Sequence, residues 1–389
     1  MKAQLRITFI FLLIATVFGL LLRGQLAGYF SFNFKNILHT HSHVAILGWM
    51  YNAALVLLQF VVFKKQKAKL STIFWVTQTT FVGMLFSFPF QGYAFFSILF
   101  STLYLFCSYF LVYQLFKQSS GLSNKYVAQF LKWAAVFLVL SSLGPYFLAI
   151  VMAKGLADTY WYKLAIYWFL HFLYNGFFVA VFFAYLLHKA PNLKYVKWIS
   201  VLTNWSVIPL FTLSVLWLKP HVMFYVVAAV FSVMQLLAFI LLINKIKIGL
   251  IFQNLFVKKV MLLVLLAYGL KVVFQLLASF PLVQTYINST VSYSVIGYIH
   301  LVMLGVFTLF FIAVFMADKL IKNSKLIRLG VVFLVLGIIF SEVLIFSESI
   351  AIYFLQQNIL NLSNYLFWIS MLMPLGVLSI TVSLFQNQK

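Results

Sequence analysis

Cysteine, acidic residues and charge in general are scarce in this chain, and each shortage excludes a class of protein. The 389 residues include one cysteine, Cys107, which excludes an intrachain disulfide framework and a thiolate metal site. Only 8% of the residues are charged, against about 25% in soluble domains, and 65% are hydrophobic. We therefore expect an integral membrane protein with almost no soluble part, in contact with the lipid bilayer.

The four acidic residues leave a formal net charge of +23, which taken alone would suggest nucleic-acid binding. The basic residues, however, fall in short connections between apolar runs, which is typical of membrane topology rather than of a basic groove. We therefore expect no nucleic-acid partner. The first apolar run begins near Arg6 and no small-residue cleavage site follows it, so we expect a retained first span.

Apolar runs of about 20 residues, the length that crosses a bilayer, predict an all-α polytopic bundle of about twelve transmembrane helices. The runs begin near residues 6, 37, 70, 93, 126, 161, 198, 223, 259, 293, 327 and 365. Their short connections predict a single integral membrane domain over residues 1–389. After the eleventh run we expect a long, semi-polar outer connection over Ser347–Asn364.

Lysine and arginine are distributed very unequally between the two sides of this topology. One side holds only Arg23, Lys35, Lys154, Lys163 and Lys219, Lys271 lies within a span, and the remaining Lys and Arg fall on the other side. Because cytoplasmic loops carry the excess of Lys and Arg, both termini are predicted to be cytoplasmic.

Three histidines inside membrane-length runs are each followed five residues later by a glycine. They are His43 with Gly48, His171 with Gly176, and His300 with Gly305. Histidine is costly in lipid, so an intramembrane histidine indicates a functional site. Buried neutral imidazole is well suited to bind a metal or a haem iron. The even spacing of the three motifs is compatible with an internal repeat of about 130 residues.

The predicted helices place these histidines in the outer half of the bilayer. At 1.5 Å per residue, His41 and His43 lie roughly 6–9 Å below the outer face, His300 roughly 9–10 Å and His171 roughly 15 Å. On a regular helix His39 and His43 share a face while His41 points away. We therefore expect His41 and His43 to serve different partners.

Each of these residues also has a structural interpretation. An intramembrane histidine can simply hydrogen-bond a neighbouring helix, and a glycine can serve helix packing instead of making room for a flat ring. His39 at the rim, and His188 and His221 in predicted loops, are expected to be structural.

Three further polar residues are candidates for a proton path or for pairing with haem propionates: Lys271, Glu342 and Arg23. Lys271 and Glu342 lie within spans, where ionisable groups are rare and mark functional sites. An ion pair between the two is the structural alternative, and interfacial anchoring is the alternative for Arg23.

The motifs carry a family resemblance. HxHxxxxGW (His41, His43, Gly48 and Trp49) resembles the haem-ligand helix of membrane haem–copper proteins. HFLYNG at His171, HLVMLG at His300 and the segment Lys271–Pro281 resemble further pieces of that group. The chain is most similar to the NnrS-like haem- and copper-containing proteins, which resemble a distant branch of the haem–copper oxidase subunit I fold.

This resemblance implies a b-type haem held by two of His41, His43, His171 and His300. A remaining histidine would either hold copper or leave a position open for a diatomic ligand. The resemblance also implies a multi-pass protein of the bacterial inner membrane. The chain departs from the oxidases, because it has no adjacent His-His pair and His300 stands alone, with Tyr298 two residues before it. A complete oxygen-reducing centre with two haems and a copper is therefore not expected.

The sequence leaves two functions open. The first is a haem-binding redox protein of the haem–copper type that handles electrons, nitric oxide or oxygen. Its electron donor would be a quinol or a periplasmic cytochrome, and whether it is an oxidoreductase is left open. The second is a proton-coupled secondary transporter without a cofactor, in which His171, Lys271 and Glu342 would titrate along a substrate path.

Overall fold

The computed structural model describes residues 1–64 and 67–386; two of the lysines used for the orientation, Lys65 and Lys389, lie outside them. Within the described residues, twelve helices are long and apolar enough to cross a membrane, which confirms an all-α polytopic membrane bundle. The spans are Lys2–Leu26, Phe34–Val62, Ala68–Gln91, Phe95–Ser119, Lys125–Ala153, Tyr160–Lys189, Val196–Leu218, Val222–Lys245, Leu255–Ala278, Val291–Ala317, Lys325–Leu355 and Leu362–Gln386.

The chain packs into two compact units. Unit 1 comprises Met1–Cys107, Asn254–Met261 and Ser292–Lys389, and unit 2 comprises Ser108–Gln253 and Leu262–Val291. The helix α5 (Phe95–Ser119) and the helix α12 (Leu255–Ala278) contribute residues to both units.

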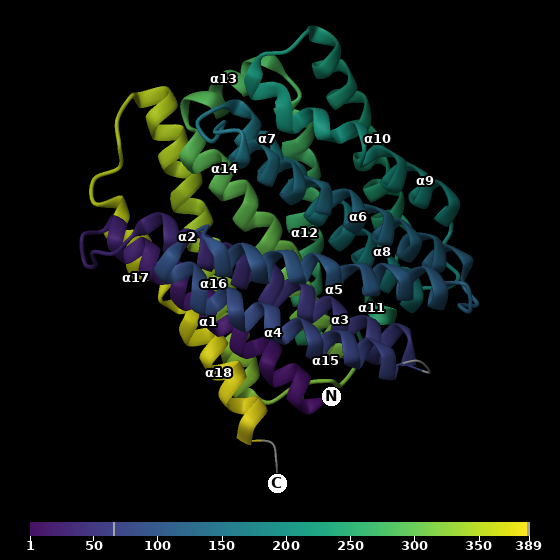
Figure 1. The fold of residues 1–389 in the computed structure, drawn as a ribbon. Helices are drawn as coiled ribbons and strands as arrows, with labels where there is room; N and C mark the ends of the chain where they lie inside the picture. Colours follow the sequence, from purple (N-terminus) through teal and green to yellow (C-terminus); the bar gives the residue numbers. More distant parts are fainter. Residues whose placement is uncertain (65–66, 387–389) are drawn as a thin grey trace. The chain divides into compact units, whose positions relative to one another are not determined.

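The helices of each unit can be followed by colour in Figure 1. Unit 1 contains α1 (Lys2–Leu26), α2 (Phe34–His43), η1 (Val44–Tyr51), α3 (Asn52–Leu57), η2 (Leu58–Val62), α4 (Lys67–Gln91), α14 (Val291–His300), η6 (Leu301–Thr308), α15 (Leu309–Ala317), α16 (Lys325–Ile350), η7 (Ala351–Leu355), α17 (Leu362–Ser370) and α18 (Leu372–Gln386). Unit 2 contains α6 (Lys125–Ala153), α7 (Tyr160–Leu170), η4 (His171–Phe178), α8 (Val179–Lys189), α9 (Val196–Ser206), η5 (Pro209–Leu218), α10 (Val222–Lys245), α11 (Ile248–Ile251) and α13 (Pro281–Ser289).

The three spans that carry the histidine–glycine motifs are the most buried. In their most apolar windows 83% (Phe34–Val62), 89% (Tyr160–Lys189) and 83% (Val291–Ala317) of the residues are buried, against 28–50% in the other nine spans. A helix that is apolar on all sides can be enclosed by its neighbours, since it has no polar face that needs water. The motif spans are therefore inner helices, and their histidines are surrounded largely by protein.

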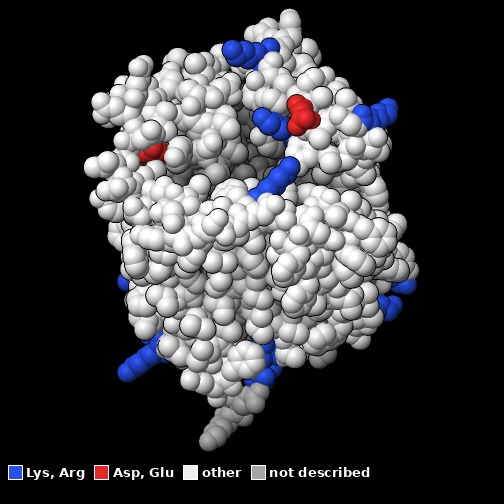
Figure 2. Space-filling model, turned by 60° about the vertical axis from the view of Figure 1, so that its left-hand side comes forward, with Lys and Arg blue, Asp and Glu red and all other residues white. Residues whose placement is uncertain are grey.

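The outer spans present apolar side chains on their exposed faces. Phe90 is 84% exposed and Phe95 is 72% exposed, which in water would be unfavourable for side chains of this size. The face drawn in Figure 2 consists mostly of uncharged residues, with Lys, Arg, Asp and Glu in a few isolated places. These faces are suited to lipid contact, as the composition predicts.

Small residues bring α16 and α18 of unit 1 into close contact. A Cβ atom on Gly330 would lie 2.4 Å from the carbonyl oxygen of Gly376, so the two backbones touch where neither residue has a side chain. Close backbone approach at small residues is the usual way in which membrane helices pack.

The predicted outer connection over Ser347–Asn364 is wrong in extent. Helix α16 continues to Ile350 and then as the π-helix η7 to Leu355. The buried carboxylate of Glu348 accepts a hydrogen bond of 2.8 Å from the backbone N–H of Ile359, so its polar side chain does not end the helix. The carboxylate of Glu348, which suggested a loop, thus has its hydrogen-bond partner within unit 1.

Candidate functional site

Each of the three motif histidines stands at the start of a π-helical segment. The π-helix η1 follows His43 directly, η4 begins at His171, and η6 follows His300 directly. All three segments are eight residues long and contain the motif glycine. Such π-segments are rare and occur frequently at functional sites, so the shared spacing in the sequence corresponds to a shared backbone feature.

Polar side chains satisfy backbone groups of these segments in unit 1. The hydroxyl of Thr308 donates to the carbonyl of Met303 at 2.9 Å, and Nδ2 of Asn52 donates to the carbonyl of Gly48 at 2.8 Å. Nε1 of Trp49 also donates to Oγ1 of Thr308 at 2.9 Å and so joins η1 to η6. This buried contact holds the two motif helices of unit 1 against each other.

Two of the motif glycines make room for a phenylalanine of the preceding span. A Cβ atom on Gly48 would lie 2.6 Å from the ring of Phe11 in unit 1. In unit 2, a Cβ atom on Gly176 would lie 2.6 Å from Cβ of Phe137 and would also contact the Phe137 ring. The neighbours of both glycines are therefore protein side chains, which favours the helix-packing interpretation at these two positions.

His41 faces helix α1. Its Nδ1 lies 2.9 Å from the carbonyl oxygen of Ala15, and its Cε1 would be 3.0 Å from a Cβ atom on Gly19. Because a carbonyl can only accept, Nδ1 carries the proton and Nε2 keeps its lone pair. Among the residues that the structure describes, none hydrogen-bonds Nε2, so this nitrogen is in the form that binds metals.

His300 also places Nδ1 near an oxygen, although at a longer distance than a hydrogen bond. Its Nδ1 lies 3.6 Å from Oε1 of Glu342 on α16, and its Nε2 makes no hydrogen bond within the described residues. The side chain of His300 is 27% accessible although its span is among the most buried, whereas that of Glu342 is only 10% accessible. Neither oxygen of Glu342 has a hydrogen-bond partner.

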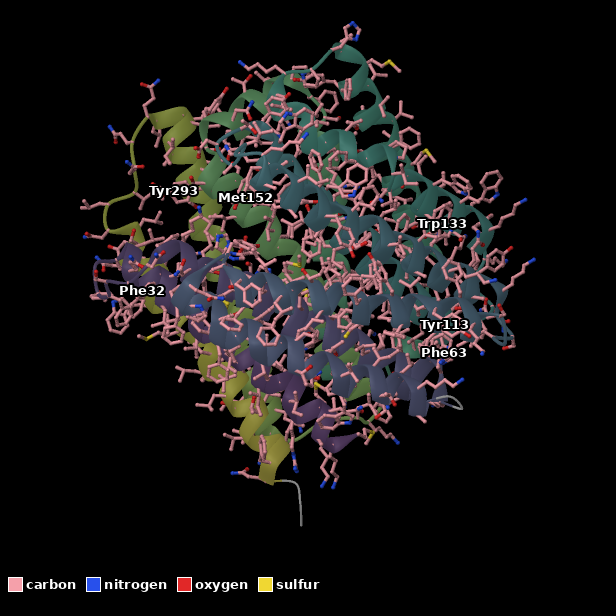
Figure 3. The ribbon with its side chains drawn as sticks, viewed as in Figure 1. Phe32, Phe63, Tyr113, Trp133, Met152 and Tyr293 are labelled. Atoms are coloured by element: carbon pink, nitrogen blue, oxygen red, sulfur yellow. The ribbon has the colours of Figure 1, made fainter. Side chains whose placement is uncertain are left out.

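Arg23 completes this cluster in unit 1. It interacts electrostatically with Glu342, with His41 and His300, and with Tyr293, which Figure 3 labels on α14. His300 interacts with His41 as well. Four spans thus bring together two imidazoles, one carboxylate and one guanidinium.

His43 lies on the other side of its helix. Its ring stacks on Phe88 with the centroids 4.2 Å apart, and its Nδ1 lies 2.8 Å from the carbonyl oxygen of His39. The ring of His39 packs against Tyr93 at 4.6 Å, and its buried Nε2 has no partner. The predicted division of faces is therefore present, with His39 and His43 toward α4 and His41 toward α1.

In unit 2, both ring nitrogens of His171 are occupied. Nε2 donates to the carbonyl of Val207 at 2.8 Å, and Nδ1 accepts from Nδ2 of Asn175 at 3.3 Å. The carbonyl of Val207 is available because the N–H of Phe211 bonds Ile208 instead, at the start of the 3₁₀ segment η5. These contacts satisfy the imidazole within the protein, so we leave His171 out of the ligand set proposed below.

Lys271 lies at the centre of a polar network in unit 2. Its side chain is fully buried, and its Nζ donates to Oε1 of Gln235 at 3.3 Å and lies 5.2 Å from the ring centroid of Tyr268. One turn further on, Nε2 of Gln275 donates to Oδ1 of Asn175 at 3.4 Å, and Asn175 bonds His171. Lys271 and His171 interact electrostatically.

The cluster in unit 1 contains side chains of the kinds that hold a haem. Haem iron takes one or two axial ligands, and His41 and His300 each present an unbonded Nε2. The acceptor at the other nitrogen is the usual partner of a metal-binding imidazole. Arg23 is a cation of the kind that pairs with propionates.

In residues 1–64 and 67–386, no group of three or more His, Cys, Asp or Glu side chains is placed to hold a metal ion. His39 and His43 share a face, but no third protein ligand joins them.

Sequence reasoning missed several residues that position this site. Ala15 and Gly19, which contact His41, are small residues four positions apart on α1, a spacing typical of close helix contacts that would have identified them. Thr308 and Gln235 carry no comparable signal. His221 accepts from the N–H of Met223 at 3.3 Å and caps α10, as expected of a loop residue.

Comparison with models of known protein families and with curated proteins gives no match to this chain, so its function is argued from its own residues.

Proposed function

We propose that this protein is a haem-binding redox protein of the bacterial inner membrane in which His41 and His300 are the axial ligands. One observation carries the proposal. His41 holds Nδ1 against the carbonyl oxygen of Ala15 on α1, His300 places Nδ1 3.6 Å from a carboxyl oxygen of Glu342 on α16, and both leave Nε2 unbonded within the described residues. An acceptor at Nδ1 fixes the tautomer and orientation of a ligand histidine and raises its basicity.

The other residues of the cluster have complementary roles. Glu342 places a buried carboxyl group 3.6 Å from Nδ1 of His300, which as a carboxylate would make the imidazole a stronger donor and favour an oxidised metal. Arg23 offsets that charge and can bind a propionate. A b-type haem bound there would supply one-electron chemistry between its ferric and ferrous states.

Two histidine ligands favour electron transfer over gas binding, because no axial position stays open. The proposal therefore commits to an electron carrier, and nitric oxide or oxygen binding is the outcome to be tested against it. The resemblance to NnrS-like proteins remains part of the proposal, and a quinol or a periplasmic cytochrome is the proposed electron donor.

The optical spectrum of the detergent-purified chain, oxidised and dithionite-reduced, with iron and copper analysis of the same sample, tests the proposal. We expect a Soret band that shifts on reduction, iron at about one per chain, and no effect of carbon monoxide. A band that responds to carbon monoxide would show an open axial position and a gas-reactive site. A colourless, iron-free protein from haem-replete cells would rule out the haem function.

A second candidate, proton-coupled transport, is favoured by the network in unit 2. Lys271, Gln235, Gln275, Asn175 and His171 form a buried set of polar groups in which two side chains can hold a proton. Buried ionisable groups of this kind mark proton relays in transporters. A colourless protein whose proteoliposomes take up protons with a solute, and whose Lys271→Met variant does not, would establish this function instead.

A further inference from the structure

A cavity of about 400 Å³ lies in unit 2 where α5 turns into α6. Seven residues line it: Ser119, Ser120, Leu122, Lys125, Ala128, Gln129 and Lys132. The cavity is distinct from the histidine cluster of unit 1 and from the Lys271 network. It lies among the lysines that the sequence assigns to the cytoplasmic side.

One face of α6 supplies the charge. Lys125, Ala128, Gln129 and Lys132 follow the spacing of a single helix face, so both ammonium groups belong to the same wall. Both lysines are exposed. Neither forms an ion pair with a carboxylate in residues 1–64 and 67–386, so the wall is an uncompensated positive charge at the membrane boundary.

The lining of the cavity also contains a buried hydroxyl group. The side chain of Ser119 is 0% exposed, and its Oγ has no hydrogen-bond partner. Most buried polar groups are hydrogen-bonded, and one that is not requires an explanation such as a ligand or an ion. The neighbouring hydroxyl of Ser120 is already used, because it donates to the carbonyl of Phe116 at 3.2 Å.

The backbone at the start of α6 is also already used. Oδ1 of Asn124 accepts from the N–H groups of Tyr126 at 3.0 Å and Val127 at 3.3 Å. An anion in the cavity would therefore be held by side chains, with the helix dipole as an additional favourable field.

We propose that this cavity binds a phosphate group, with Lys125, Lys132 and the Ser119 hydroxyl as its donors. Two ammonium groups without a carboxylate partner in the described chain, and a hydroxyl group without a hydrogen bond there, match the several acceptor oxygens of a phosphate. Nζ of Lys125 also lies 5.1 Å from the ring centroid of Tyr126. Anionic phospholipids are enriched in the cytoplasmic leaflet, and a cavity at that boundary meets their headgroups directly. The source we expect is the headgroup of an anionic phospholipid; free phosphate is the other source.

Native mass spectrometry of the full chain in detergent, titrated with phosphatidylglycerol or phosphatidylcholine, tests the site. We expect tighter binding of phosphatidylglycerol, weakened about fivefold by each of Lys125→Ala and Lys132→Ala. Ser119→Ala is expected to weaken it about fivefold without changing the charge. The pair Lys194→Ala and Lys197→Ala removes two exposed lysines on the same predicted side and serves as the matched control.

Competition with inorganic phosphate identifies the source. If millimolar phosphate displaces the lipid, the site recognises phosphate itself, and if it does not, the site needs the lipid. Equal binding of the two lipids, or equal losses in the control pair and in the cavity variants, would overturn the proposal, because both results indicate general attraction to a basic surface. The Lys125→Arg and Lys132→Arg variants keep the charge and should keep binding, which separates loss of the site from misfolding.

Discussion

Nδ1 of His300 lies 3.6 Å from Oε1 of Glu342, a carboxylate whose oxygens have no hydrogen bond elsewhere in the described chain. The two residues come from separate spans, α14 and α16, and are among the few ionisable groups inside the bundle. A buried carboxylate is stabilised by such a partner. The His300–Glu342 pair can therefore influence the haem affinity and the midpoint potential of the proposed site.

Glu342→Gln is expected to weaken haem retention about 10–100-fold, the usual effect of losing a carboxylate behind a metal-binding histidine. It should also raise the midpoint potential, since glutamine cannot carry the negative charge that Glu342 as a carboxylate would place near the iron. Haem content and a potentiometric titration measure both. Glu348→Gln is the control, because Glu348 bonds the backbone at Ile359 instead. An unchanged midpoint potential in Glu342→Gln would show that Glu342 does not act on the proposed haem site.

The two neighbouring histidines of α2 should behave differently when each is replaced by alanine. His41→Ala is expected to abolish the Soret band, because it removes the proposed ligand nitrogen Nε2 of an imidazole that Ala15 holds at Nδ1. His43→Ala should keep the band, since His43 stacks on Phe88 on the other side of the helix. Loss of the band in His43→Ala alone would reverse the assignment of the two residues.

His300→Ala should also lose the haem, whereas His171→Ala should retain it, because both ring nitrogens of His171 are hydrogen-bonded within unit 2. Absorbance per mole of purified chain gives the comparison, with His221→Ala as a control outside the spans. A normal spectrum in His300→Ala would remove His300 from the ligand set.

Gly48→Ala is expected to lower the free energy of unfolding by about 1–3 kcal/mol, because the added Cβ must displace the ring of Phe11. Thermal unfolding of the purified protein in detergent measures the change. Gly121→Ala provides the reference, since its nearest atom would be 3.7 Å away, an ordinary contact. Equal stability of the two variants would show that Phe11 moves aside without cost.

Lys271→Met and Gln235→Leu should change stability in opposite directions. Removing the buried ammonium is expected to raise the free energy of unfolding by about 1–3 kcal/mol. Removing its hydrogen-bond acceptor should lower it by a similar amount, about 1–3 kcal/mol, because the lysine is left unpaired. If Lys271→Met were instead the less stable variant, the ammonium group would be a structural element of unit 2.

Much of the fold could be predicted because a membrane restricts the choices. Each apolar run must satisfy its own backbone hydrogen bonds in lipid, so its length alone predicts a helix. All twelve predicted spans are present among the described residues, and their starts agree within four residues. The prediction of a connection over Ser347–Asn364 was wrong in extent, because Glu348 accepts a hydrogen bond from the backbone N–H of Ile359, eleven residues further along the chain.

The sequence by itself determined the membrane class, the number of spans and the histidines that deserve study, since these depend on hydropathy and local spacing. Only the tertiary structure decided which ring nitrogens are occupied. His171 is satisfied by Val207, and His41 by Ala15 at one nitrogen only, through contacts that join residues 36 and 26 positions apart. Apolar helices of similar composition give no signal of which neighbour each will pack against, so these contacts could not be predicted from the sequence.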